Sequence, residues 1–179
     1  MKITINSIKY SAKEGDRLLD IARQNHAHIG YFCGGNALCQ TCYTRITEGA
    51  ELLSPLNDIE QEILSPNLIQ AGTRLACQAT IEKPGTITMV SAIEEVKQMT
   101  QTTPLQLPLY MGIMGWEAAV MFPRTIAMQI GRILEGKLDL EELGRDMTEA
   151  IREAAATVFR LILPTPGESL KEKDSEGHE

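Results

Sequence analysis

Apolar and polar residues alternate over short distances in the first half of the chain, a pattern that predicts strands. The strands are expected over 3–8, as a hairpin turning at Asn6-Ser7, and over 43–46, 74–81 and 86–92. Two short helices are expected between them, because Asp16 is a good N-cap and Ser54-Pro55 is a typical helix start. The first half therefore combines short strands with short helices.

The apolar period becomes helical in the second half. After a polar segment that contains two prolines, one helix is predicted over roughly 115–134, with a bend or break at Pro123. A second helix begins at Asp139, where Glu142 completes a capping-box pattern. Apolar residues recur along one face of this second helix, at Leu140, Leu143, Met147, Ile151, Ala154, Val158 and Ile162.

This change of period predicts an α+β fold class and divides the chain into four parts. Residues 1–94 are expected to form one small domain, 95–110 a linker, 111–163 an α-helical extension and 164–179 a disordered tail. Two helices rarely bury a whole apolar stripe between them. The extension is therefore predicted to be a separable arm for homo-oligomerisation or for docking to a partner.

Composition and charge exclude several classes of function. With 43% hydrophobic residues among 179, the chain can bury a core, and its formal net charge of −7 disfavours nucleic acid as the main partner. The N-terminus lacks the apolar region of a secretory signal, and no run of about 18 apolar residues indicates a transmembrane segment. A cytoplasmic location is the default expectation, with contact to a membrane surface left open.

Four cysteines carry the clearest chemical signal, with the spacing C-x5-C-x2-C-x34-C. In a reducing compartment, clustered cysteines are usually metal ligands or redox groups rather than disulfides. Two irons bridged by two sulfides need four terminal thiolates, and here one loop would supply Cys33, Cys39 and Cys42 while a distant strand supplies Cys77. A structural zinc site is the alternative, although zinc ligands usually come as two close pairs.

Two further segments strengthen the signal from the cysteines. The segment at 15–20 reads GDRLLD and resembles the helix opening of the [2Fe–2S] ferredoxin family, and the segment at 74–78 reads RLACQ and resembles that family's fourth-ligand motif. The five residues at 34–38 between the first two cysteines are similar to the adrenodoxin and putidaredoxin branch. The resemblance covers 1–94 and implies a β-grasp fold with one [2Fe–2S] cluster.

The resemblance also implies a function. It implies a one-electron carrier that shuttles electrons between a reductase and an acceptor protein, and the chain has no recognisable nucleotide-binding or nucleophile–base motif that would make it an enzyme. The alternative is a redox-sensing or structural interaction module whose helical extension docks to a partner complex or mediates dimerisation. Discrimination between them rests on whether the cluster exchanges electrons rapidly.

Neighbouring residues add weaker expectations. Three carboxylates lie in a region similar to the adrenodoxin-type acidic interaction helix, and they are either a docking surface or a solvated face: Asp58, Glu60 and Glu62. Two histidines precede the loop, where a Rieske site would need histidine ligands, but the four cysteines favour a place outside the ligand set for His26 and His28. Three polar residues of the loop are candidates for hydrogen bonds to sulfur, namely Asn36, Gln40 and Thr41.

Overall fold

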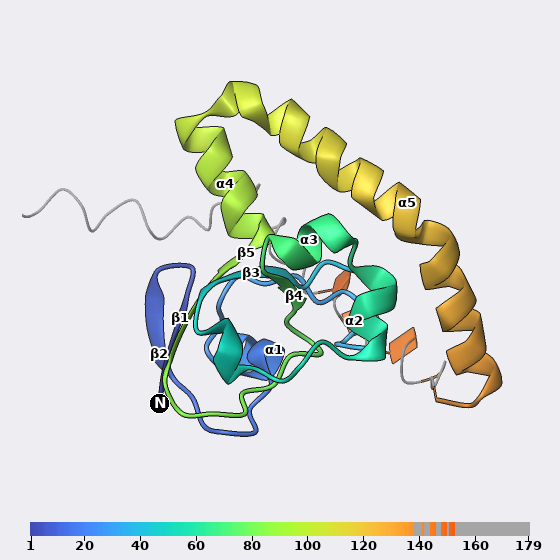
Figure 1. The fold of residues 1–179 in the computed structure, drawn as a ribbon, viewed down its shortest axis with the longest axis horizontal. Helices are drawn as coiled ribbons and strands as arrows, with labels where there is room; N and C mark the ends of the chain where they lie inside the picture. The colour runs from blue at the N-terminus through green and yellow to red at the C-terminus, as the bar shows by residue number, and fades with distance from the viewer. Residues whose placement is uncertain (138–140, 142–143, 146–147, 150, 153–179) are drawn as a thin grey trace, which may run out of the picture.

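The structure is a computed structural model that describes residues 1–137 together with 141, 144–145, 148–149 and 151–152 (Figure 1). The predicted second helix from Asp139 and the predicted tail lie mainly outside the described residues. In chain order the elements are β1 (Lys2–Ile5), β2 (Ile8–Ser11), α1 (Leu18–Gln24), β3 (Tyr43–Glu48), η1 (Ala50–Leu52), α2 (Asp58–Ile63), α3 (Pro66–Gln70), β4 (Thr73–Leu75), β5 (Thr86–Ser91), α4 (Ala92–Thr102), η2 (Pro104–Gln106) and α5 (Leu107–Leu134).

The strands form one five-stranded mixed sheet in the order β2-β1-β5-β3-β4. β1 pairs antiparallel with β2 and parallel with β5, and β3 pairs antiparallel with both β5 and β4. The first hairpin turns at Asn6 and Ser7, as predicted, with φ of 51° and 71°. Positive φ at both residues is the geometry of a type I′ turn, a common two-residue hairpin turn.

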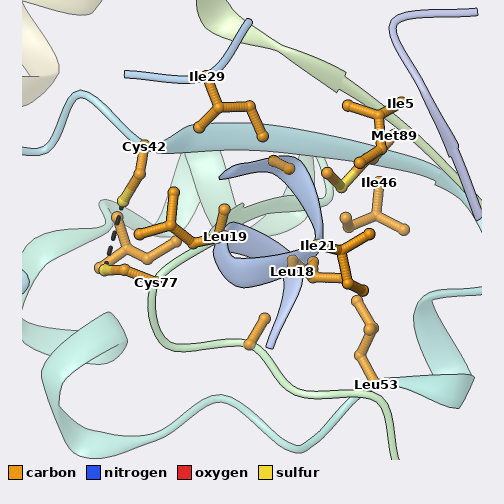
Figure 2. Packing of buried hydrophobic residues seen from close by; sticks show 14 of the residues in the cluster. Ile5, Leu18, Leu19, Ile21, Ile29, Cys42, Ile46, Leu53, Cys77 and Met89 are labelled. Carbon is orange, nitrogen blue, oxygen red and sulfur yellow. Dashed lines mark hydrogen bonds between the residues drawn. The ribbon is translucent and has the colours of Figure 1, made fainter. Parts of the chain in front are cut away.

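Helix α1 packs its apolar side against this sheet. Leu18, Leu19 and Ile21 are buried with sheet residues such as Ile5 and Met89 (Figure 2). A mixed sheet grasping one helix in this way confirms the predicted α+β class and the β-grasp architecture. The core thus lies between α1 and the concave side of the sheet, next to the cysteines.

The predicted starts of two helices were wrong because side-chain hydrogen bonds determine where these helices begin. Asp16, the predicted N-cap of the first helix, instead accepts the Lys13 N–H at 2.7 Å and closes the preceding turn, so α1 begins only at Leu18. The helix expected at Ser54-Pro55 starts later, at Asp58. There, Asn57 and Glu60 form a capping box, which satisfies N–H groups of the first turn.

The predicted strand over 74–81 is also shorter than expected. β4 ends at Leu75, because the Leu75 carbonyl accepts the N–H groups of Gln78 and Ala79 and the chain turns there. Isolated bridges then join Thr80 to Arg17 and Ile81 to Leu53. The fourth cysteine therefore lies on a turn rather than on a strand.

A buried ion pair joins α2 to β4. Glu60 has 0% exposure, and both of its carboxylate oxygens accept hydrogen bonds from the Arg74 guanidinium, at 2.8 and 2.7 Å. The Glu60 carboxylate also accepts the Leu75 N–H at 3.0 Å, and Arg74 donates to the Ser54 carbonyl at 2.8 Å. These bonds fix the residues that immediately precede Cys77.

The segment at 95–110, predicted as a linker, is mostly helical in the structure. It holds most of α4, then η2 and the first turn of α5. α5 runs over 28 residues and continues through Pro123, where a bend or break was predicted, so the helix is not broken there. Hydrogen bonds to the first domain on both sides of this proline hold the two halves of the helix on the same surface: Glu117 accepts from Asn67, and Thr125 donates to the Glu62 carbonyl.

The two faces of α5 are arranged opposite to those of an ordinary surface helix. All three charged residues of α5 bond to the first domain: Glu117 to Asn67, Arg124 to Glu62, and Arg132 to the Asn36 carbonyl. Large apolar side chains are exposed on the rest of the helix, namely Leu109, Met111, Ile113, Trp116, Val120, Phe122, Ile126, Ile130, Ile133 and Leu134. We call this set the outer face of α5; globular helices usually turn such residues inward.

The position of α5 bears on the predicted separable arm. The helix runs past α3 and α2 along the side of the molecule opposite to β1 and β2 (Figure 1). The extension is therefore in direct contact with the first domain through a side that carries its charged residues together with the buried Met121. Within the part of the chain that the structure describes, no helix has both the length and the apolar character needed to cross a membrane.

Candidate metal centre

The four cysteines meet beside the core. Cys33, Cys39 and Cys42 lie on the loop between α1 and β3, and Cys77 lies on the turn after β4. Cys33, Cys42 and Cys77 are buried, Cys39 is half-buried, and all four are free thiols. The fold thus brings together all four of the residues that the sequence predicts as ligands.

The four sulfurs form two pairs. The Sγ atoms of Cys42 and Cys77 are 3.4 Å apart (Figure 2), and Cys33 is hydrogen-bonded to Cys39. Among the described residues, no three His, Cys, Asp or Glu side chains are grouped so as to hold one metal ion. Two pairs of thiolates are the arrangement that two irons need, with two terminal ligands on each. The residues present therefore fit a [2Fe–2S] cluster.

The hydrogen bond within each pair shifts the pKa values of the two thiols in opposite directions. The bond from Cys39 lowers the pKa of the Cys33 thiol to about 5, whereas the same bond and burial raise the pKa of Cys39. In the other pair the bond from Cys42 lowers the pKa of Cys77, and it raises the pKa of Cys42 together with burial. Iron binds thiolates rather than thiols, so binding of the cluster must release whatever protons the four cysteines still hold.

The loop directs backbone N–H groups toward the sulfurs. The Leu38 N–H donates to Cys33 Sγ at 3.4 Å, and the Ala37 N–H hydrogen-bonds to Cys77. This requires a left-handed backbone, with φ of 100° at Gly35 and 56° at Ala37. A Cβ at Gly35 would lie 3.3 Å from Leu19 and 3.8 Å from Cys77, so the loop backbone passes close to the core and to the fourth cysteine.

Side chains near the sulfurs differ partly from the expected set. Thr41 Oγ1 lies 3.0 Å from Cys39 Sγ, as expected for a hydrogen bond to sulfur. Asn36 instead donates to the Cys33 carbonyl at 2.8 Å, and Gln40 accepts from the Tyr43 hydroxyl at 3.2 Å. Gln78 was not among the predicted donors, but its Nε2 is 3.6 Å from Cys77 Sγ.

Two other sets of weighed residues lie outside the ligand set. His26 and His28 are exposed, and the hydrogen bonds at His28 go through its carbonyl, which supports their exclusion as ligands. Of the three carboxylates in α2, only Asp58 is exposed. Glu60 is buried with Arg74, and Glu62 pairs with Arg124 of α5. Two of the three carboxylates of the acidic face that the resemblance implies therefore form ion pairs within the protein.

Known proteins resemble this chain in two different ways. Residues 3–82 match the 2Fe-2S iron-sulfur cluster binding domain. Chlorosome protein I of Chlorobaculum tepidum is 43% identical over 166 residues, which is 93% of this chain and 68% of that protein. Chlorosome protein J of the same organism is 37% identical over 162 residues, 89% of this chain and 71% of that protein.

Similarity to ferredoxins covers less of the chain. A 2Fe-2S ferredoxin of Pseudomonas aeruginosa is 30% identical over 73 residues, which is 40% of this chain and 65% of that protein. The similarity to the chlorosome proteins therefore extends into the helical extension, whereas the similarity to the ferredoxin spans less than half of the chain.

Proposed function

The chain belongs to the 2Fe-2S ferredoxin family and binds a [2Fe–2S] cluster, and from this we propose that it carries single electrons between a reductase and an acceptor protein. The proposal rests on one observation, that the four cysteines form two pairs: Cys33 with Cys39, and Cys42 with Cys77. When bound there, the cluster supplies one-electron chemistry. The protein itself is proposed to bind and transfer, not to catalyse.

The surroundings of the cysteines suit this role. Cys33, Cys42 and Cys77 are buried, so three of the four ligands are kept from water. The half-buried Cys39 and the 46% exposed ring of Phe32 mark the side of the centre that is nearest to solvent. A redox partner that docks on this side has the shortest path to the centre. N–H groups of the loop stabilise the negative charge on the sulfurs.

The carrier function is tested by the redox properties of the anaerobically purified full chain. We expect a negative midpoint potential, because all four ligands are anionic thiolates. It should lie nearer to about −400 mV than to the range of His-ligated centres, which is roughly −150 to +300 mV. The measurement is a titration followed by electron paramagnetic resonance, combined with stopped-flow reduction and reoxidation. A clearly positive potential, or a cluster that cycles only over hours, contradicts a carrier.

A second proposed role, as an interaction module, rests on the outer face of α5. Trp116 is 69% exposed and Val120 52% exposed. None of the three charged residues of α5 belongs to the outer face. Contiguous apolar surface of this kind marks contact sites. Because the relatives that match nearly the whole chain are named chlorosome proteins, we propose that this face attaches the protein to a chlorosome. The predicted cytoplasmic location stays a prediction.

The attachment is tested by sedimentation of purified full-length protein with isolated chlorosomes. The triple variant Trp116→Gln, Val120→Gln, Ile126→Gln is expected to stay in the supernatant. Its three polar side chains lose the favourable free energy that apolar side chains gain when they are removed from water. The control Ile8→Gln changes an apolar residue of β2 that is 58% exposed, and this variant should sediment like the wild type. Equal sedimentation of both variants contradicts attachment through α5, and a wild-type dimer that dissociates in the triple variant would assign the face to self-association.

A further inference from the structure

Two polar side chains of α5 reach the loop that carries the cysteines. Gln129 Nε2 donates to the Ala37 carbonyl at 2.8 Å, and Arg132 Nη1 donates to the Asn36 carbonyl at 2.9 Å. Gln129 is only 8% exposed, in a helix whose other side is apolar. Burial of a polar group is costly unless it is hydrogen-bonded. These contacts are therefore specific features of the docked helix.

The two accepting carbonyls belong to the peptide units that serve the sulfurs. The Asn36 carbonyl shares its planar amide with the Ala37 N–H, which bonds to Cys77. The Ala37 carbonyl shares its amide with the Leu38 N–H, which donates to Cys33 Sγ at 3.4 Å. Each side chain of α5 thus holds the oxygen end of a peptide whose N–H end faces a thiolate of a different pair.

Arg132 also orients Gln129. Its Nη1 donates to Gln129 Oε1 at 3.0 Å, so the Gln129 amide directs its NH₂ group at the Ala37 carbonyl. Ala37 itself has a φ of 56°, which is unfavourable for a residue with a Cβ and persists only where surrounding contacts hold it. Chains of hydrogen bonds strengthen one another, so donation to the carbonyl makes the N–H a better donor to sulfur.

We propose that Arg132 and Gln129 are positioning residues of the [2Fe–2S] centre. They orient and polarise the two peptide units at 36–38, and through them they raise the reduction potential and slow the loss of the cluster. The sign follows because N–H donors and a nearby guanidinium favour the more negative, reduced state. This inference rests on the proposed ligand set, since it concerns the N–H groups that face Cys33 and Cys77.

The test uses full-length protein with its cluster reconstituted anaerobically. The variants Arg132→Met and Gln129→Met remove the donors but keep much of the side-chain volume. Both are expected to lower the midpoint potential and to release the cluster to a chelator on the order of 10-fold faster. Arg132→Lys keeps the charge and a donor and should recover most of both properties.

The control is Arg124→Met, which removes another arginine of α5 that pairs with Glu62 instead of the loop. It should keep the wild-type potential and cluster lifetime. Wild-type values in Arg132→Met and Gln129→Met, with far-ultraviolet circular dichroism unchanged, overturn the inference. Equal shifts in all three Met variants overturn it too, because the effect would then come from general docking of α5. Wild-type protein without a cluster would instead refute the proposed function itself.

Discussion

Full-length protein in which Cys33, Cys39, Cys42 or Cys77 is replaced by Ala is expected to purify without a stable [2Fe–2S] cluster. The wild type should hold about two irons and two acid-labile sulfides per chain, because four thiolates terminate a two-iron core. Each replacement removes one of the two terminal ligands of one iron, and the sequence contains no fifth cysteine that could take its place. Iron and sulfide analysis and the visible absorption spectrum measure the loss.

The matched control for the cysteine series is His26→Ala. This residue is exposed near the loop, and its replacement should leave the iron content and the spectrum unchanged. Any cysteine variant that keeps a native spectrum and stability removes that residue from the ligand set. Zinc as the only stoichiometric metal after anaerobic reconstitution would refute the whole assignment.

The second large effect concerns the buried pair of Glu60 and Arg74. Replacing Glu60 by Ala leaves the Arg74 guanidinium buried beside an unsatisfied Leu75 N–H, and breaking such a pair typically costs about 3–5 kcal/mol of unfolding free energy. The measurement is urea unfolding of the anaerobic protein, followed by far-ultraviolet circular dichroism and by cluster absorbance. Since β4 leads into the turn that carries Cys77, both signals should fall at lower urea.

An exposed pair on the same helix provides the control for Glu60→Ala. Glu62 pairs with Arg124 at 2.8 Å near the surface, and Glu62→Ala should cost no more than about 1 kcal/mol. The double variant Glu60→Leu, Arg74→Leu should lose less than Glu60→Ala, because it leaves no unpaired buried charge. Equal losses in Glu60→Ala and Glu62→Ala would show that the buried pair does not hold β4 in place.

Local patterns in the sequence predicted the parts of the structure that depend on near neighbours. The spacing of the three loop cysteines and the hairpin turn at Asn6-Ser7 are of this kind, since ligand loops and two-residue turns follow from adjacent residues. The ends of helices were less predictable. Both Ser54 and Asn57 are good helix starts, and the choice of Asn57 depends on Ser54 accepting the distant Thr80 N–H at 3.2 Å.

The orientation of α5 was beyond prediction for a different reason. An apolar period in a helix normally indicates the face turned toward the core, whereas α5 turns its polar residues inward. The sequence did contain a signal, because Gln129 and Arg132 are polar, three residues apart, in a helix whose residues are mostly apolar. Their partners are the carbonyls at 37 and 36, more than 90 residues earlier, and only the fold reveals them.

The two faces of α5 make attachment and electron affinity parts of one equilibrium. A partner that binds the outer face and shifts the helix also shifts Arg132 and Gln129, and with them the peptide units at 36–38. Thermodynamic reciprocity then requires that reduction of the centre change the affinity of the outer face by the same factor by which attachment changes the reduction equilibrium. A single rigid helix is sufficient for such coupling, with its strength set by how far attachment displaces α5.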